Sequence, residues 1–218
     1  MKTAQDIYTE YRIMPLLQTH QLRVAAVGKL ICQNFKEPVN EHDVILTGLF
    51  HDMGNITKAN LATFPESLEP EGVEYWKGVK SEFMRKYGED AHAANIAIAK
   101  ELQLPPDVIE LIDGISFSNI DNIVKNGSFE QKIAEYADDR VGPHGILPLR
   151  ERLDEARARY VNSGKTYYTK EGFERLSESA FVLEKQVFAR AHITAEEIDD
   201  DTINPLVEKL RHYPVSNS

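Results

Sequence analysis

Cysteine is nearly absent from this 218-residue chain. Cys32 stands alone, which excludes an internal disulfide and any metal site built from several cysteines. Its apolar neighbours in VGKLICQNF predict a buried core residue. No apolar run approaches the roughly 20 residues of a membrane span, and the N-terminus lacks the basic start and apolar stretch of a signal peptide. These absences predict a cytoplasmic protein with no membrane partner.

Positive charge is also scarce. The chain has 25 Lys and Arg against 35 Asp and Glu, for a net charge of −10, and no block rich in lysine or arginine. A nucleic-acid polymer is therefore not an expected partner, because binding one requires the neutralisation of many phosphates. A small anionic ligand remains compatible with this charge where cations or a metal gather locally.

Apolar residues recur at helical spacing nearly throughout, with no internal repeat and no convincing strand ladder. Pro15 can open a helix whose inner positions run to Ile31. Asn40 can cap a helix that reaches about Met53, and Ser128 can begin one that Pro143 stops. Residues 54–73 are expected to be mostly loop, and further helices are expected over 74–87, 90–103, 107–116, 148–161 and 170–191, with a last one from the Thr194–Glu197 capping pattern. The sequence predicts one all-α domain over residues 1–218, a compact multi-helix bundle.

The stretch LTGLFHDMGNI places His51 and Asp52 at the end of a helix that is apolar on almost every side. The two side chains are about 100° apart around such a helix, so both can reach one ion beyond its end. A core histidine with its own hydrogen-bond partner is the alternative. An aspartate in the last turn opposes the helix dipole, however, and so requires a cationic partner.

Other helices supply similar residues. His20 shares the apolar face of its helix, although a structural core histidine is again the alternative. Asp138 flanks the inner face of the helix after Ser128, whereas Asp139 is expected to point into solvent and Arg140 to pair with surface carboxylates. Two imidazoles and two carboxylates suit a divalent ion such as Mn, Fe, Co, Ni, Zn or Mg.

The series His20, His51–Asp52 in LFHDMGN and Asp138 in YADDRV resembles the H…HD…D signature of HD-domain metal-dependent phosphohydrolases. The resemblance covers a metal-binding core of about residues 15–145, with C-terminal helices over about 146–213 packing on it. It implies an all-α fold and a divalent ion held by these four side chains. It also implies hydrolysis of a phosphate ester in a small phosphorylated metabolite, with a nucleotide as the expected class.

Members of this family with two metals carry further histidines. His92 lies where the first is expected, but the next position falls near Asp113–Gly114, where this chain has none. One metal ion is therefore expected, with a second ion, using Asp113 as an oxygen ligand, as the less favoured alternative. His92 would then contact a phosphate or a group outside the metal's direct ligands, unless it is a helix-start residue of no function. Many relatives have a lysine where this chain has Asn55, so a cationic role there is either lost or passed to Lys58.

Four more residues are candidates for catalysis or substrate binding. Arg23 could hold a phosphate oxygen or fix Asp52 or Asp138, and Lys58 is either a phosphate contact or plain surface. Glu89 and Asp90 could orient the attacking water, or form an ordinary acidic helix start.

Two other functions stay open beside a phosphomonoesterase. They are a phosphodiesterase acting on cyclic or linear nucleotides, and a nucleotide- or metal-binding regulatory module with weak turnover. An oxygenase with two irons is disfavoured by the incomplete set of histidines, and a homodimer is left open.

Overall fold

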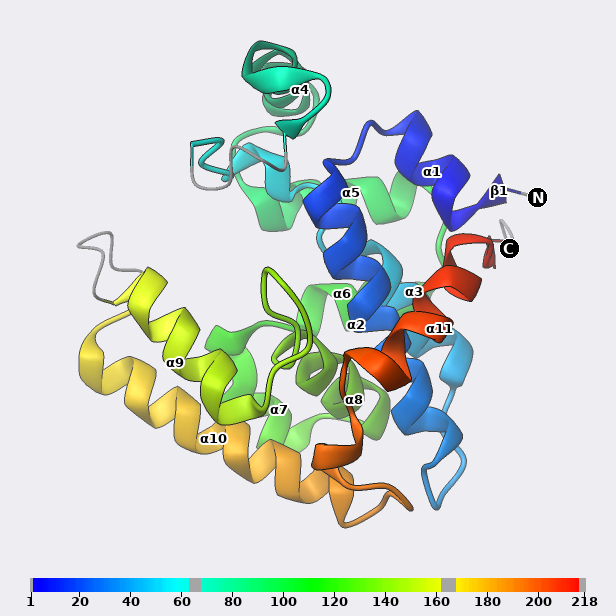
Figure 1. Ribbon diagram of the computed structural model, residues 1–218, viewed down its shortest axis with the longest axis vertical. Coiled ribbons are helices and arrows are strands. Elements are labelled where there is room, and N and C mark those ends of the chain that lie inside the picture. Colours follow the sequence, from blue (N-terminus) through cyan, green and yellow to red (C-terminus); the bar gives the residue numbers. More distant parts are fainter. Residues whose placement is uncertain (1, 63–67, 162–167, 216–218) are drawn as a thin grey trace.

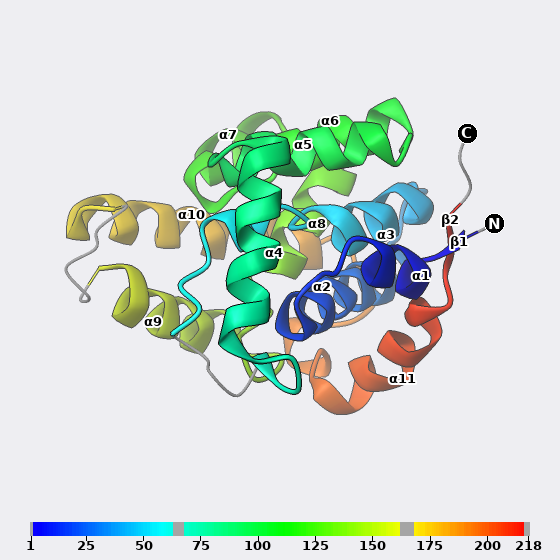
Figure 2. The same cartoon turned by 90° about the horizontal axis from the view of Figure 1, so that it is seen from above.

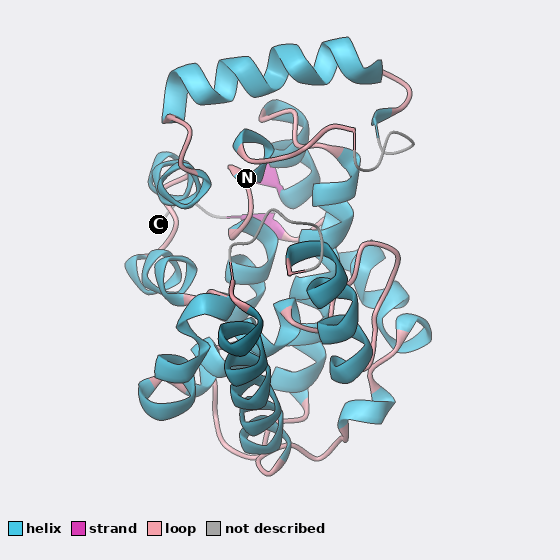
Figure 3. Cartoon of the chain, turned by 90° about the vertical axis from the view of Figure 1, so that its left-hand side faces the viewer, coloured by secondary structure: helices cyan, strands magenta, loops and turns pink. Residues whose placement is uncertain are grey.

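A computed structural model describes residues 2–62, 68–161 and 168–215 of the chain, which are mostly helical (Figures 1 and 3). The protein is all-α, as predicted. Two strands of two residues, β1 (Lys2–Thr3) and β2 (Pro214–Val215), pair antiparallel and join the two ends of the chain. The helices are α1 (Ala4–Glu10), α2 (Pro15–Gln33), α3 (Glu41–Phe50), α4 (Gly72–Tyr87), α5 (Ala91–Glu101), α6 (Pro106–Gly114), α7 (Ile120–Asn126), α8 (Phe129–Asp138), α9 (Leu149–Tyr160), α10 (Lys170–Phe188) and α11 (Asp200–Arg211).

Helix α2 is the central element and packs against α3, α8 and α11 (Figure 1). Gly48 allows α3 to approach it closely, because a Cβ at this position would lie 2.6 Å from the backbone of Ala25. The interior between these helices is apolar, and Leu22, Leu49 and Ile133 have no exposed surface. Cys32 is buried in the same core, which confirms its prediction.

Most helix boundaries agree with the sequence patterns, and Asn40 and Ser128 cap α3 and α8 as expected. Two helices, α1 and α7, were not predicted, since each has only seven residues and little periodicity. The Thr194–Glu197 capping box is present, but it begins the short 3-10 helix η4 (Ala195–Glu197). The last α-helix begins only at Asp200, because Asp199 supplies its own capping box.

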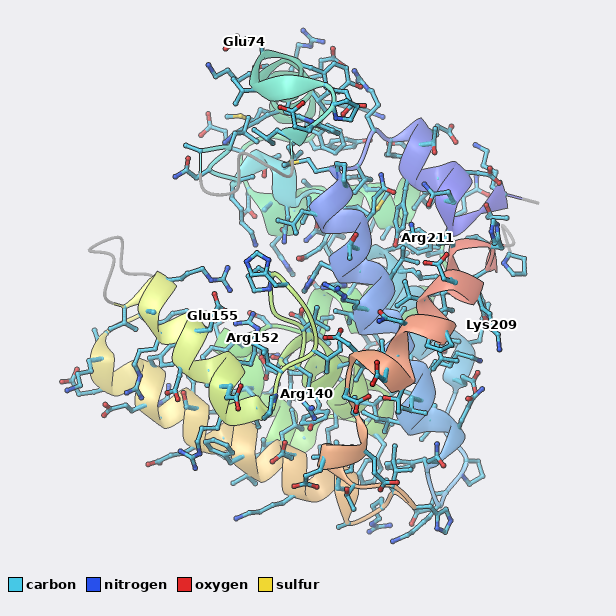
Figure 4. All side chains as sticks on the ribbon, viewed as in Figure 1. Glu74, Arg140, Arg152, Glu155, Lys209 and Arg211 are labelled. Atoms are coloured by element: carbon cyan, nitrogen blue, oxygen red, sulfur yellow. The ribbon has the colours of Figure 1, made fainter. Side chains whose placement is uncertain are left out.

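Arg140 does not pair with surface carboxylates, which corrects the prediction. Its side chain is 2% exposed and donates hydrogen bonds to the backbone carbonyls of Leu147, Ala195 and Ile198 and to the Tyr136 hydroxyl. An arginine can be buried when its donors are satisfied in this way. These bonds join Arg140, which follows α8, to the segment before α9 and to the segment before α11; Arg140 is labelled in Figure 4.

None of the described helices has both the length and the apolar character needed to cross a membrane.

Candidate functional site

The four predicted metal ligands come from three helices. His20 lies on α2, His51 is the C-cap residue of α3, Asp52 follows in the next turn, and Asp138 is the last residue of α8. Because α2 packs against both α3 and α8, their side chains are brought to one place. Helix α3 ends at Phe50, a few residues before the predicted end near Met53, so both members of the His–Asp pair lie just beyond it.

The polar atoms of these residues face one another over short distances. His20 Nε2 lies 3.0 Å from an Asp138 carboxylate oxygen and 3.7 Å from an Asp52 oxygen. His51 Nε2 lies 3.6 Å from the same Asp138 oxygen and 3.8 Å from the same Asp52 oxygen. One ligand atom each from His20, His51 and Asp52 lies within 4.8 Å of the other two. Separations of this size are those of ligands placed around a common point.

The surroundings of the two ring nitrogens of His51 indicate which kind of ligand this common point suits. Its Nδ1 donates a hydrogen bond to the Gly48 carbonyl at 3.0 Å, which leaves the lone pair of the neutral ring on Nε2. His51 is 5% exposed, and its Nε2 atom has no hydrogen-bond partner among the described residues. An unpaired buried nitrogen is costly, whereas a histidine fixed through one nitrogen and free at the other has the arrangement of a metal ligand. The site therefore fits a divalent cation.

Charges at the site influence one another strongly. Burial would lower the pKa of His51, but the negative charges of Asp52 and Asp138 raise it to about 9. Burial likewise opposes the charged form of Asp138, but hydrogen bonds and charges from His20 and His51 outweigh it and hold the pKa of Asp138 well below the usual range. Without a cation, these shifts favour a protonated His51 imidazole beside an ionised Asp138 carboxylate.

Asp139 is not solvated, contrary to the prediction. Its side chain is half-buried, and Oδ2 is shielded from solvent without a hydrogen-bond partner among the described residues. Burial, followed by the charge of Asp138, raises the pKa of Asp139 to about 8, while Arg152 of α9 opposes this rise. Asp139 is the C-cap residue of α8 and keeps a helical backbone, so the angle along the helix did not reveal its surroundings, which include Arg152 of α9.

Glu135 is a further acidic residue that the sequence did not single out. It is 1% exposed on α8, and burial followed by repulsion from Asp139 and Asp138 raises its pKa well above the usual range. One carboxylate oxygen has no hydrogen-bond partner within the described parts of the chain. Its position three residues before Asp138 places it on the same side of α8, and this spacing is the signal that could have identified it.

Two buried amides hold the HDMGN turn. The Gln21 side-chain oxygen accepts a hydrogen bond from the Asp52 backbone N–H at 3.3 Å, and the Asn95 side-chain oxygen accepts one from the Gly54 N–H at 2.5 Å. A Cβ at Gly54 would lie 2.6 Å from that of Ala94, so a glycine is required where α5 packs on this turn. No periodicity identifies such residues, because their role depends on which segment packs beside them.

Arg23 lies one helical turn from His20 and is half-buried. It forms no ion pair with Asp52, Asp138 or any other residue that the structure describes. Of the two roles considered for it, fixing one of these aspartates is therefore not observed. Lys58 is exposed and begins the segment after the short helix η1 (Asn55–Thr57), outside the cluster.

His92 also lies outside the four-residue cluster. It is 53% exposed, and its Nε2 lies 2.9 Å from a carboxylate oxygen of Asp113, which is 66% exposed. Asp90 caps α5 by accepting hydrogen bonds from the backbone N–H groups of His92 and Ala93, so its side chain is already used. Glu89 is exposed. Of the two interpretations of Glu89 and Asp90, the structure therefore shows the acidic helix start, at Asp90.

Comparison with known proteins agrees with this geometry. The model of the HD domain family matches residues 17–161, which is well over half of the chain and includes all four residues of the cluster. No curated protein and no solved structure matches the chain. The fold and the cluster define an all-α protein with a candidate site for a divalent cation. The chain belongs to the HD domain family.

Membership in this family indicates metal-dependent phosphohydrolase activity in general terms. HD domains bind divalent metals, and His20, His51 and Asp52 are close enough together to hold one.

Proposed function

We propose that the protein hydrolyses a phosphate monoester in a small phosphorylated metabolite, with a nucleotide as the expected substrate class. The observation that carries this proposal is the buried Nε2 of His51, which faces two carboxylates and has no hydrogen-bond partner among the described residues. Without a cation this nitrogen has only ion-pair contacts of 3.6 Å to Asp138 and 3.8 Å to Asp52 within the described parts of the chain, which are longer than a hydrogen bond, and a bound cation would give it a ligand bond.

His20, His51, Asp52 and Asp138 would hold the divalent cation. When bound, such an ion polarises a phosphoryl oxygen and lowers the pKa of a coordinated water. The two carboxylates of the site neutralise a doubly charged cation, so an anionic phosphate can still approach. Gln21 and Asn95 contribute by fixing the backbone of the turn from which Asp52 projects.

Three cationic or titratable residues could offset the charge of the phosphate. Arg23 is the best placed, because it is half-buried, lies one turn from His20 and has no ion pair with a described residue. An arginine presents several donors to phosphate oxygens in a fixed fork. Lys58 and His92 lie on the two segments that flank the HDMGN turn, and we assign them substrate contacts further from the cation.

The proposal is tested with the purified full chain, stripped of metal and reconstituted separately with Mn, Fe, Co, Ni, Zn and Mg. Each form is assayed against nucleoside monophosphates, general phosphate monoesters, and linear and cyclic phosphodiesters. We expect metal-dependent phosphate release from monoesters, and none after Asp52→Ala. Turnover of diesters alone would replace the proposal with a phosphodiesterase. An absence of turnover in every metal form, with a cation bound, would favour a regulatory module.

A further inference from the structure

A groove of about 600 Å³ lies beside the HDMGN turn, between the segment 58–62 and helix α4. Figure 2 shows α4 running across this face of the molecule, and α4 packs on η1 and α5. The Asn55 N–H donates to the Asp52 carbonyl, and the Lys58 N–H donates to the Asn55 carbonyl. The backbone rises by ~2 Å per residue in such tight turns, so Lys58, six residues after Asp52, lies about 12 Å along the chain from it. The groove therefore begins within the length of a small metabolite from the candidate metal ligands.

The charged side chains that line the groove are lysines. Lys58 enters it from the chain segment, and Lys77 and Lys80 enter it from α4, while none of the described lining residues is acidic. This contrasts with a net charge of −10 for the whole chain. Three like charges around one hollow repel one another and create a local positive potential that attracts anions.

The lysines keep donors available for a ligand. The side chain of Lys58 has no hydrogen bond or ion pair with any described residue. Lys80 Nζ donates to the Ala59 carbonyl at 2.8 Å, which holds α4 against the segment and leaves two of its three donors free. Lys77 lies 2.7 Å from Glu74 on the exposed side of α4, and surface pairs of this kind are worth only ~0–1 kcal/mol, so an anion can compete with it.

The remaining lining is mainly small or apolar and includes Leu61 and Val73. Among the described residues, Val73 is one of the few large apolar side chains that are exposed, at 38%. A hollow with apolar walls and lysine ammonium groups suits a ligand that combines an uncharged part with phosphate. The lysines on α4 could alternatively form a solvated helix face, but the bond from Lys80 across the groove to Ala59 is not explained by solvation.

We propose that this groove binds a second phosphate group of the substrate, which then carries at least two phosphates. The inference rests on the proposed function, since the first phosphate would lie at the His20–His51–Asp52–Asp138 cluster. Lys77 and Lys80 would thereby determine specificity, by favouring bisphosphates or polyphosphate-bearing compounds over simple monoesters.

The direct test is binding of inorganic tripolyphosphate to the full chain by calorimetry, at low salt and with a chelator present, so that no metal site contributes. We expect binding that weakens as salt rises, and a loss of at least tenfold in affinity for the double variant Lys77→Gln, Lys80→Gln. The matched control is Lys125→Gln, Lys185→Gln, two exposed lysines on α7 and α10. This control should bind within twofold of the wild type.

A second variant separates this proposal from that of the catalytic site. Asp52→Ala should bind tripolyphosphate as the wild type does, because the groove lies outside the cluster. Absence of binding to the wild type, or equal binding by the Lys77→Gln, Lys80→Gln variant, would overturn the groove proposal, whatever the catalytic assays show.

If the wild type turns over phosphate monoesters, the double variant should raise KM for a nucleoside bisphosphate more than for the corresponding monophosphate, and the control variant should change neither. An equal rise for both substrates would contradict a site for the second phosphate.

Discussion

The protein contains two groups of histidine and aspartate that differ mainly in burial. In the first, His51 is 5% exposed and faces Asp52 and Asp138, and its Nε2 has no hydrogen-bond partner in the part of the chain that the structure describes. In the second, His92 and Asp113 are both more than half exposed and lie 2.9 Å apart. The same residue types thus form a buried cluster in one region, where His51 Nε2 has no hydrogen-bond partner among the described residues, and an exposed pair in the other.

Packing accounts for this difference. Helices α2, α3 and α8 surround the first group, in which His51 is buried and His20, Asp52 and Asp138 are 21%, 21% and 37% exposed, so water has limited access and each charge lies beside a partner of opposite sign. The second group lies where α5 begins and α6 ends, and water can solvate both side chains. Residue type alone therefore does not identify a metal ligand in this chain. A metal ligand is identified here by burial together with a nitrogen or oxygen atom that has no hydrogen-bond partner among the described residues.

The largest effect that would sharpen this comparison is expected from Asp138→Asn. A neutral amide is a poor ligand for a hard cation and also a weak partner for His20, so phosphate release should fall by at least ~100-fold. Steady-state kinetics with saturating metal measures this loss. The neighbouring variant Asp139→Asn is the control and should lose far less, and an inverted order would show that the wrong aspartate faces the cation.

The exposed pair is tested by His92→Ala. If His92 donates to a phosphoryl oxygen, turnover should fall, with ~100-fold as the lower end of the usual range for such groups. Stability should change by less than ~1 kcal/mol, since an exposed ion pair contributes little. Metal analysis of the variant should still give the wild-type stoichiometry of one ion per chain. A decrease from two ions to one would show that His92 is a ligand and that the two groups form one site.

A smaller effect, on stability, is expected from Asp139→Asn in the metal-free protein. Because folding raises the pKa of Asp139 to about 8, the folded state binds its proton more tightly than the unfolded state does. Stability is therefore lost as pH rises from about 4 through about 8, and the amide removes this loss. The variant should unfold at a higher temperature than the wild type at pH 8, with the difference shrinking towards pH 4. A difference that grows at low pH would contradict the assigned burial.

The smallest effect concerns Cys32, whose pKa is raised by burial and by the negative charges of Glu41 and Glu130, while Lys29 lowers it by less. Together these effects raise the pKa of this thiol to about 12, so almost no thiolate exists at pH 8. The folded protein should react very slowly with iodoacetamide, and the protein unfolded in urea should react at the rate of a free thiol. Rapid labelling of the folded state would show that the core around α2 opens readily.

The sequence predicted the features that depend on local patterns. Helical periodicity and the caps at Asn40 and Ser128 gave the main helices, and the apolar context of LFHDMGN placed His51 in the interior. Asp139 and Arg140 were misplaced because their surroundings come from α9 and from the segment before α11, which are distant in sequence. Glu135, Gln21 and Asn95 were missed for the same reason, since a polar residue reveals its role only through what packs on it.

The central claim is that the buried group holds one divalent ion. Metal titration of the wild type and of Asp52→Ala, with circular dichroism of both, tests it most directly. The account predicts one ion per chain for the wild type and none for the variant, with the helical content unchanged because Gln21 bonds only the backbone of residue 52. An ion retained by a folded Asp52→Ala variant, or no ion bound by the wild type, would contradict it.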